Sequence, residues 1–234
     1  MQVNQDRHLL HIPSREIERV LWEQGELLVP SQGDCAEADY LHWEPLSFCG
    51  AYYDICFNYR HTPTQEQMIT QYFAANCEEV RRATESVRRA MRSRTARSYN
   101  SLIAEHHLLA LCIESNRFDT CSKSELFDLT GMVDLLLRVG NLEVGLDIQI
   151  PTRHAEKWIE IKRRRQQLRL RDGRVFWEGV VLPLKMDFHQ MQEVAGIHLF
   201  TPVPWIRTIR QLIEQEQRCM MGTGSRQIGL FQQK

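Results

Sequence analysis

The sequence predicts an α/β fold with a mixed central sheet, preceded by a mainly helical N-terminal extension. Three observations support this expectation. Apolar residues recur at helical spacing across residues 64–97. Two apolar segments flank Gly140-Asn141, which is the pattern of a strand hairpin with a two-residue turn. After this hairpin the pattern alternates between helix and strand, and such alternation is typical of α/β folds.

Composition excludes several classes of protein. The chain has 234 residues, of which 43% are hydrophobic, enough for a substantial core. No apolar run reaches the roughly 18 residues of a membrane span, and the polar first residues do not resemble a signal peptide. The seven cysteines are odd in number and form no C-x-x-C pair, which favours reduced, mostly buried thiols. We therefore expect a cytoplasmic or nucleoid-associated protein that is not secreted and has no membrane partner.

The N-terminal unit is expected to comprise residues 1–97 and to contribute substrate selection or dimerisation. Its aromatic stretch Phe48–Tyr59 could hold strands. Residues 64–97 are predicted to form one long basic helix. The last arginines of this helix could face phosphate: Arg92, Arg94 and Arg97.

The second unit, residues 98–218, is predicted to be the α/β core, followed by a C-terminal tail at 219–234. Pro151 should end the hairpin, Thr152 can cap the next helix, and Pro204 suits the first turn of the last helix. The expected elements are a helix at 98–115, strands at 132–139 and 142–150, a helix from Thr152 to about Arg165, strands near 180–184 and at 196–201, and a helix from Pro204 to about Arg218.

Basic residues are concentrated in one segment of a chain whose formal net charge is only −1. Residues 153–174 hold nine Lys and Arg against three acidic residues. Such a local excess favours contact with phosphates, because each neutralised phosphate releases counterions. The alternative is an ordinary solvated helix face. The residues expected to contact nucleic acid are Arg153, Lys157, Lys162, Arg163, Arg164 and Arg165.

Three acidic residues occupy positions where an unpaired charge would be costly. Asp134 interrupts an apolar strand, and Glu105 lies on the apolar side of its helix. Asp147 and Gln149 share one face of the second hairpin strand by alternation. Carboxylate oxygens are the ligands that Mg²⁺ and Mn²⁺ prefer, so a cation could compensate these acids.

Each residue also has a simpler interpretation. Asp134 could pair with an arginine, and Glu105 could bond to the nearby Ser101. Asp147 and Gln149 could be the wet face of a hairpin. Taken together with the element order and the basic segment, the metal site is favoured over these alternatives. The adjacent His106 and His107 point about 100° apart on a helix, so they are expected to be core and surface residues rather than ligands of one metal ion.

A helix bearing Glu105, then Gly131-Met132-Val133-Asp134, then Asp147-Ile148-Gln149 after a short hairpin resembles the PD-(D/E)XK nuclease superfamily. The resemblance covers roughly residues 98–201. It implies a restriction-endonuclease-like core in which Asp134 and Asp147 bind the divalent metal and Glu105 assists from the helix. It also implies that the following basic helix lines the nucleic acid.

The chain differs from the family pattern at two positions. Val133 stands where the family has proline, and Gln149 stands where it has lysine. A lysine there would orient the attacking water and stabilise transition-state charge, whereas glutamine supplies no charge. A lysine displaced to the next helix could replace it, either Lys157 or Lys162.

These residues predict a metal-dependent nuclease that hydrolyses phosphodiester bonds, with DNA expected in preference to RNA. The protein could form a homodimer. Asp134, Asp147 and Glu105 would hold Mg²⁺ or Mn²⁺, and Gln149 would complete the catalytic set. One alternative is a catalytically silent nuclease-like fold that acts as a nucleic-acid-binding or assembly subunit. Another is a partner-binding protein whose acidic residues pair with its arginine-rich helices.

Overall fold

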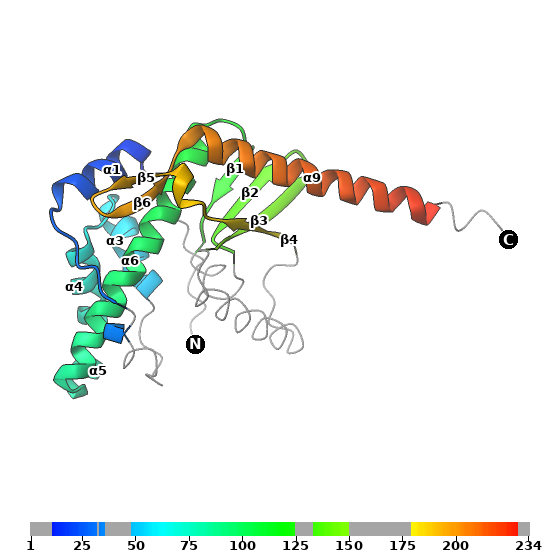
Figure 1. Ribbon diagram of the computed structural model, residues 1–234. Coiled ribbons are helices and arrows are strands. Elements are labelled where there is room, and N and C mark those ends of the chain that lie inside the picture. The colour runs from blue at the N-terminus through cyan, green and yellow to red at the C-terminus, as the bar shows by residue number, and fades with distance from the viewer. Residues whose placement is uncertain (1–10, 32, 36–47, 125–132, 150–178, 229–234) are drawn as a thin grey trace.

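The computed structural model describes residues 11–31, 33–35, 48–124, 133–149 and 179–228. Figure 1 shows a group of helices on one side and a sheet on the other, with the long helix α6 (Glu85–Glu114) running from one to the other. The sheet and the helices together confirm the predicted α/β class for this part of the chain.

The main sheet has four strands in the order β1-β2-β3-β4. They are β1 (Thr120–Ser122), β2 (Leu135–Val139), β3 (Leu142–Gln149) and β4 (Val180–Lys185). The first two pairings are antiparallel and β3 pairs with β4 in parallel, so the sheet is mixed as predicted. Gly140 has a φ of 60° at the β2–β3 turn, and a glycine at this first turn position suits a type II′ hairpin.

The two faces of β3 differ in chemistry, as the alternation predicted. Val144 and Leu146 are fully buried and belong to the hydrophobic core shared with α6. Asp147 and Gln149 project from the opposite face of the same strand. Apolar packing against α6 therefore determines the register of the strand that carries the polar pair.

The predicted strand near residues 196–201 exists, but it lies outside the main sheet. It is β6 (Ile197–Phe200), and it pairs only with β5 (Met191–Val194) in a separate two-stranded sheet. A short 3₁₀ helix, η2 (Phe188–Gln190), connects β4 to this hairpin. The hairpin lies along α6 near the end of β4 (Figure 1), and β6 contacts α6.

Two expectations for the N-terminal unit were wrong. The aromatic segment Phe48–Tyr59 is a helix, α3, rather than strands. The single helix predicted over 64–97 is broken into three pieces: α4 (Gln65–Ala75), α5 (Cys77–Arg82) and the first part of α6. The breaks have local causes, because Thr64 and Thr84 both accept backbone hydrogen bonds as N-caps, and Thr64 forms a full capping box. The remaining elements of this half are α1 (Ser14–Glu23) and η1 (Gly33–Cys35).

The helix break expected after residue 97 is also absent, because α6 continues through it to Glu114. From Leu102 to Cys112 every residue except Glu105 is buried. The reason is that α6 contacts α1, α3 and α4 as well as β1, β6 and α9. The boundary predicted between residues 97 and 98 therefore falls inside an element that both halves share.

The last helix, α9 (Pro202–Ile228), is longer than predicted at both ends. Trp205, Ile209 and Ile213 are buried, whereas Met220 is exposed. Figure 1 shows the second half of α9 extending away from the sheet, so the segment expected to be a tail from residue 219 is helical as far as Ile228.

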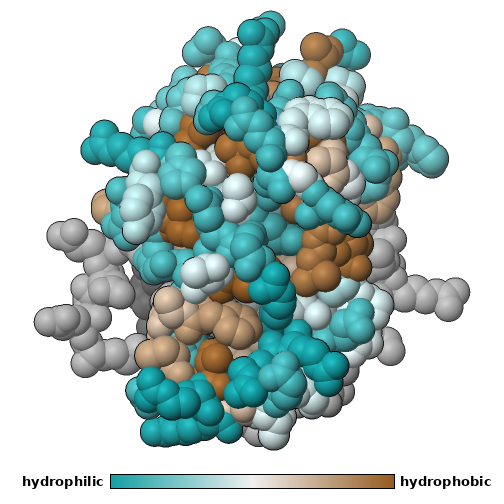
Figure 2. Space-filling model, turned by 90° about the vertical axis from the view of Figure 1, so that its left-hand side faces the viewer, coloured by the Kyte–Doolittle hydropathy of each residue, from teal (hydrophilic) through white to brown (hydrophobic). Residues whose placement is uncertain are grey.

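The surface of the helical half is chemically mixed. Several large apolar residues are exposed there, among them Trp22, Val29, Phe57 and Tyr59. Figure 2 shows hydrophobic patches on this face that are separated by hydrophilic residues. Within the described segments, no helix is long and apolar enough to cross a membrane.

The adjacent histidines of α6 are both core residues, so the expectation that one would be at the surface was wrong. His106 and His107 have exposed fractions of 0% and 1%. His106 Nδ1 lies 2.8 Å from the Tyr52 hydroxyl, and burial raises the pKa of that tyrosine. His107 Nε2 lies 3.2 Å from Glu18 Oε1, while its Nδ1 has no hydrogen-bond partner among the described residues. Burial lowers the pKa of His107 more than the bond to Glu18 raises it.

This lowered pKa predicts that the fold loses stability in acid. Folded His107 binds its proton less readily than the unfolded chain does, so its contribution is full above the unfolded pKa of about 6.5 and is lost as the pH falls. We expect the free energy of unfolding, measured in urea, to decrease from pH 7 to pH 5. The variant His107→Gln should flatten this dependence, and the matched variant His189→Gln, at an exposed histidine, should retain it. Equal slopes for wild type and His107→Gln would contradict the assignment.

Candidate functional site

Charged side chains lie on both faces of the main sheet near its junction with α6. Glu105 comes from the middle of α6, Asp134 precedes β2 directly, and Asp147 lies near the end of β3. Lys123 follows β1 and brings a positive charge to the same junction. Four elements thus supply the site, and each is held in place by apolar neighbours in the core.

Lys123 is the residue that sequence reasoning missed. Its side chain has an exposed fraction of 0%, and its Nζ lies 2.5 Å from Glu105 Oε2. The same Nζ is 3.4 Å from the carbonyl oxygen of Asp134. A buried ammonium needs such partners because the desolvation of an ion is costly. Lys123 lies in a short polar segment without periodicity, so no pattern in the sequence indicated its burial.

Asp134 lies beside Asp147 at the start of β2. Its backbone N–H donates to the Leu146 carbonyl at 2.8 Å, and its Oδ2 accepts from the Ile148 N–H at 2.6 Å. These two bonds reach the residues on either side of Asp147. The exposed fraction of Asp134 is only 6%. The structure therefore places Asp134 next to the segment of β3 that carries Asp147.

Asp147 and Gln149 are buried as well, with exposed fractions of 5% and 8%. The interpretation of this pair as the wet face of a hairpin was therefore wrong. Gln149 Nε2 donates a hydrogen bond to Asp147 Oδ2 at 2.6 Å. This bond orients the carboxylate, and it occupies one of the two oxygens that Asp147 could offer to a cation.

The carboxylates can be compared with the requirements of a divalent cation. Within the described residues, no group of three or more His, Cys, Asp or Glu side chains could hold a metal ion. The predicted set of three acids is not assembled there, and Glu105 is engaged by Lys123. Mg²⁺, however, commonly uses only one or two carboxylates and completes its shell with water and phosphate oxygens. The neighbouring Asp134 and Asp147 have the right donor chemistry for that arrangement.

A second lysine lies close to the site, on the face that carries Gln149. Lys185, the last residue of β4, pairs with Gln149 in the parallel register, and the Met186 N–H donates to the Gln149 carbonyl at 2.9 Å. Residues paired in register project from the same face of a sheet, about 4.8 Å apart. Lys185 is exposed, unlike Lys123. No sequence pattern singles it out, because its place beside Gln149 depends on the parallel pairing of β3 with β4.

The predicted basic surface is only partly described. The segment with Arg153, Lys157, Lys162 and Arg163 to Arg165 lies outside the described residues. Of the other candidates, Arg92 and Arg94 on α6 have protein partners. Arg92 forms an ion pair with Glu66 at 2.6 Å, and Arg94 hydrogen-bonds Ser98 and stacks on the Phe48 ring.

The two described cysteines nearest to this junction in the chain offer no activated nucleophile. Cys112 and Cys121 lie closest to it in the chain, and burial raises the pKa of both thiols, that of Cys121 to about 12. Of the five cysteines whose side chains the structure describes, Cys56 and Cys112 are buried, Cys121 is half-buried, and Cys77 and Cys219 are exposed. All five are free thiols, and the expectation that most would be buried holds for two of them.

Comparison of the chain with protein-family models, with curated proteins and with solved structures found no match. Functional assignment therefore depends on the geometry of the site.

The Lys123–Glu105 pair predicts strong thermodynamic coupling between the two residues. Lys123→Met would leave the Glu105 carboxylate without its ammonium, and Glu105→Gln would leave the ammonium without its carboxylate. Each single variant should lose about 2–4 kcal/mol of unfolding free energy in urea, and the double variant should lose clearly less than the sum. The exposed Arg81–Glu78 pair is the control cycle and should show far weaker coupling. Additive losses at Lys123 and Glu105 would contradict the pairing.

Proposed function

We propose that this chain is a divalent-metal-dependent nuclease that hydrolyses phosphodiester bonds, in DNA in preference to RNA. The observation that carries the proposal is the pair of buried aspartates at the β2–β3 end. Asp134 and Asp147 are each at least 94% buried, come from adjacent strands and are linked through the backbone on both sides of Asp147. Both carboxylates are largely removed from water, and a cation that they coordinate would offset the cost of burying their charge.

The topology supports the same proposal. A helix bearing Glu105 precedes an antiparallel hairpin with Asp134 and Asp147, and a further strand joins the hairpin in parallel. This order of elements is the one implied by the resemblance to PD-(D/E)XK nucleases. We therefore propose a restriction-endonuclease-like core, with Asp134 and Asp147 as the metal ligands.

In this proposal a bound Mg²⁺ or Mn²⁺ would polarise the phosphodiester and lower the pKa of a water molecule. The protein residues would then have separate tasks. Gln149 holds the Asp147 carboxylate through its amide and can orient a water, but it supplies no charge. Lys185, on the same face, would supply the missing positive charge to the developing phosphorane. Lys123 neutralises and positions Glu105 from the interior.

The second candidate is a catalytically silent nuclease-like fold that binds nucleic acid or serves in an assembly. Two observations favour it. Gln149 replaces the charged residue of the family pattern, and its amide already occupies one oxygen of Asp147. The Lys123 ammonium occupies Glu105 in the same way. Internal bonds of this kind could stabilise the acidic residues without a metal ion.

Cleavage assays separate the two candidates. Incubated with plasmid and with single-stranded and branched DNA in Mg²⁺ or Mn²⁺, the wild-type protein should cleave, and chelator should abolish cleavage. Asp134→Asn and Asp147→Asn should reduce the rate at least about 100-fold, because each removes a carboxylate that would hold the cation. Glu143→Gln is the matched control, since this exposed acid lies on the same face of β3 as Asp147.

Two results would overturn the nuclease proposal. Cleavage that persists in both aspartate variants would place the chemistry elsewhere. Binding of DNA by the wild-type protein without any cleavage, in either metal, would favour the silent fold.

The role of Lys185 has its own test. Lys185→Met should lower kcat about 10- to 100-fold, because it removes a positive charge aimed at the transition state. Lys185→Arg should retain a larger share of kcat than Lys185→Met does. Binding of the same DNA in chelator, measured by fluorescence anisotropy, should change much less than kcat in either variant. Unchanged kcat in Lys185→Met would remove this residue from the catalytic set and leave Lys157 and Lys162 as the candidates.

A further inference from the structure

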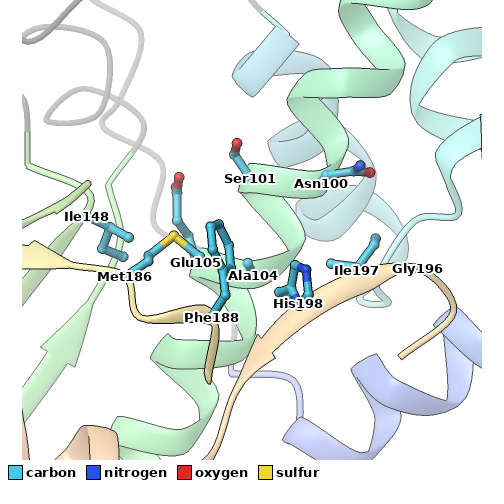
Figure 3. Close-up of a pocket in the computed structure, with 10 residues that line it drawn as sticks. All are labelled: Asn100, Ser101, Ala104, Glu105, Ile148, Met186, Phe188, Gly196, Ile197 and His198. Carbon is cyan, nitrogen blue, oxygen red and sulfur yellow. The ribbon is translucent and has the colours of Figure 1, made fainter. Parts of the chain in front are cut away.

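A cavity of about 210 Å³ opens next to the acidic junction. It lies between α6, the end of β3, the β4–η2 connection and the β5–β6 hairpin. Figure 3 shows Glu105 and Ser101 one turn apart on α6, with Phe188 rising toward the helix between Met186 and His198. The site described above uses only Glu105 from this lining.

The volume restricts the class of ligand. A dry cavity of about 150 Å³ accepts a benzene ring, and sites for drug-sized molecules begin at about 300 Å³. A cavity between these limits suits one small ring system with polar substituents. The mixed lining of the cavity supports the same class of ligand. Its apolar residues include Ile148, Met186 and Ile197, and its polar residues include Ser101 and His198.

The aromatic side chains provide a surface for stacking. Phe188 is 39% exposed, so part of its ring is accessible. Its ring centroid lies 4.8 Å from that of His198 at an angle of 45°. Nδ1 of His198 is buried and has no hydrogen-bond partner among the described residues. His198 as a whole is half-buried and lines the cavity, so it contributes polar surface there.

The position of the cavity connects it to the proposed phosphodiester site. Ile148 lines the cavity, and its backbone N–H is bonded to Asp134 Oδ2. Asp147 is the preceding residue and projects from the other face of the same strand. The cavity and the aspartates therefore lie on the two sides of the same strand end.

We infer that this cavity binds one unpaired nucleobase of the nucleic-acid substrate, stacked on Phe188 and recognised on its polar edge by His198. The inference rests on the proposed nuclease function, which it deepens by naming the substrate class. The cavity has room for one small ring system, so a base that enters it must be unpaired, and the substrate is single-stranded, or presents an extruded base, at the site of cleavage.

The test measures binding of single-stranded oligonucleotides to the full chain in chelator, so that it does not depend on cleavage. One oligonucleotide carries 2-aminopurine at its centre, and a matched one carries an abasic position there. We expect the wild-type protein to change the 2-aminopurine fluorescence. We expect it to bind the abasic oligonucleotide about ten-fold more weakly than the intact one. Short oligonucleotides limit the number of positions along the strand at which the protein can bind.

Two variants and one control complete the design. Phe188→Ala removes the stacking surface, and Ser101→Leu fills the cavity from α6; both should bind the intact and the abasic oligonucleotide equally. Phe57→Ala is the control, because Phe57 is an even more exposed phenylalanine, 52%, on α3 outside the cavity. It should retain the ten-fold preference.

The outcomes distinguish this inference from the nuclease proposal. Base-dependent binding that disappears in Phe188→Ala supports the cavity even when no metal produces cleavage. Cleavage that depends on Asp134 and Asp147, together with equal binding of intact and abasic oligonucleotides by the wild type, supports the nuclease and overturns the cavity. Loss of the preference in Phe57→Ala, or no binding of either oligonucleotide, also overturns it.

Discussion

Burial of charge at the junction of α6 and the sheet constrains the rest of the structure. Lys123 is fully buried, and the cost of removing an ammonium from water is offset only while Glu105 remains beside it. Because Lys123 also reaches the Asp134 carbonyl, one side chain connects α6, the segment after β1 and the start of β2. Any shift of α6 along its axis would separate the pair. The register of the helix against the sheet is therefore set by electrostatics as well as by apolar packing.

This register also explains why the proposed chemistry and the cavity lie on two sides of one strand end. Adjacent residues of a strand point in opposite directions, so Ile148 faces the cavity near α6 while Asp147 and Gln149 face away. The two surfaces meet only at the C-terminal end of β3. A nucleic-acid strand that crosses this end could place a phosphate at the aspartates and an adjacent base in the cavity. A duplex could not do so without opening, because its bases are already stacked and paired.

The features that followed periodicity could be predicted, and those that depended on tertiary contacts could not. Asp134 was recognisable because it interrupts an apolar strand, Asp147 because alternation places it with Gln149 on one face, and the hairpin turn was marked by Gly140. The helix at Phe48–Tyr59 was misassigned because it is apolar on most sides and lacks the periodicity of a surface helix. Lys123 carried no local signal, since only the approach of α6 makes its position an interior one. Lys185 became relevant only through the pairing of β3 with β4, a contact between distant residues.

The absence of a charge at Gln149 does not by itself decide between an active and a silent site, because charge need not come from the same strand. A parallel neighbour in register is about 4.8 Å away, and a lysine side chain can span that distance easily. Lys185 meets this condition and is exposed, so it can approach a phosphate. Lys123 does not, since it is enclosed and paired with Glu105. The two lysines therefore differ: Lys123 compensates the buried acid, whereas in the proposed nuclease Lys185 would face the substrate.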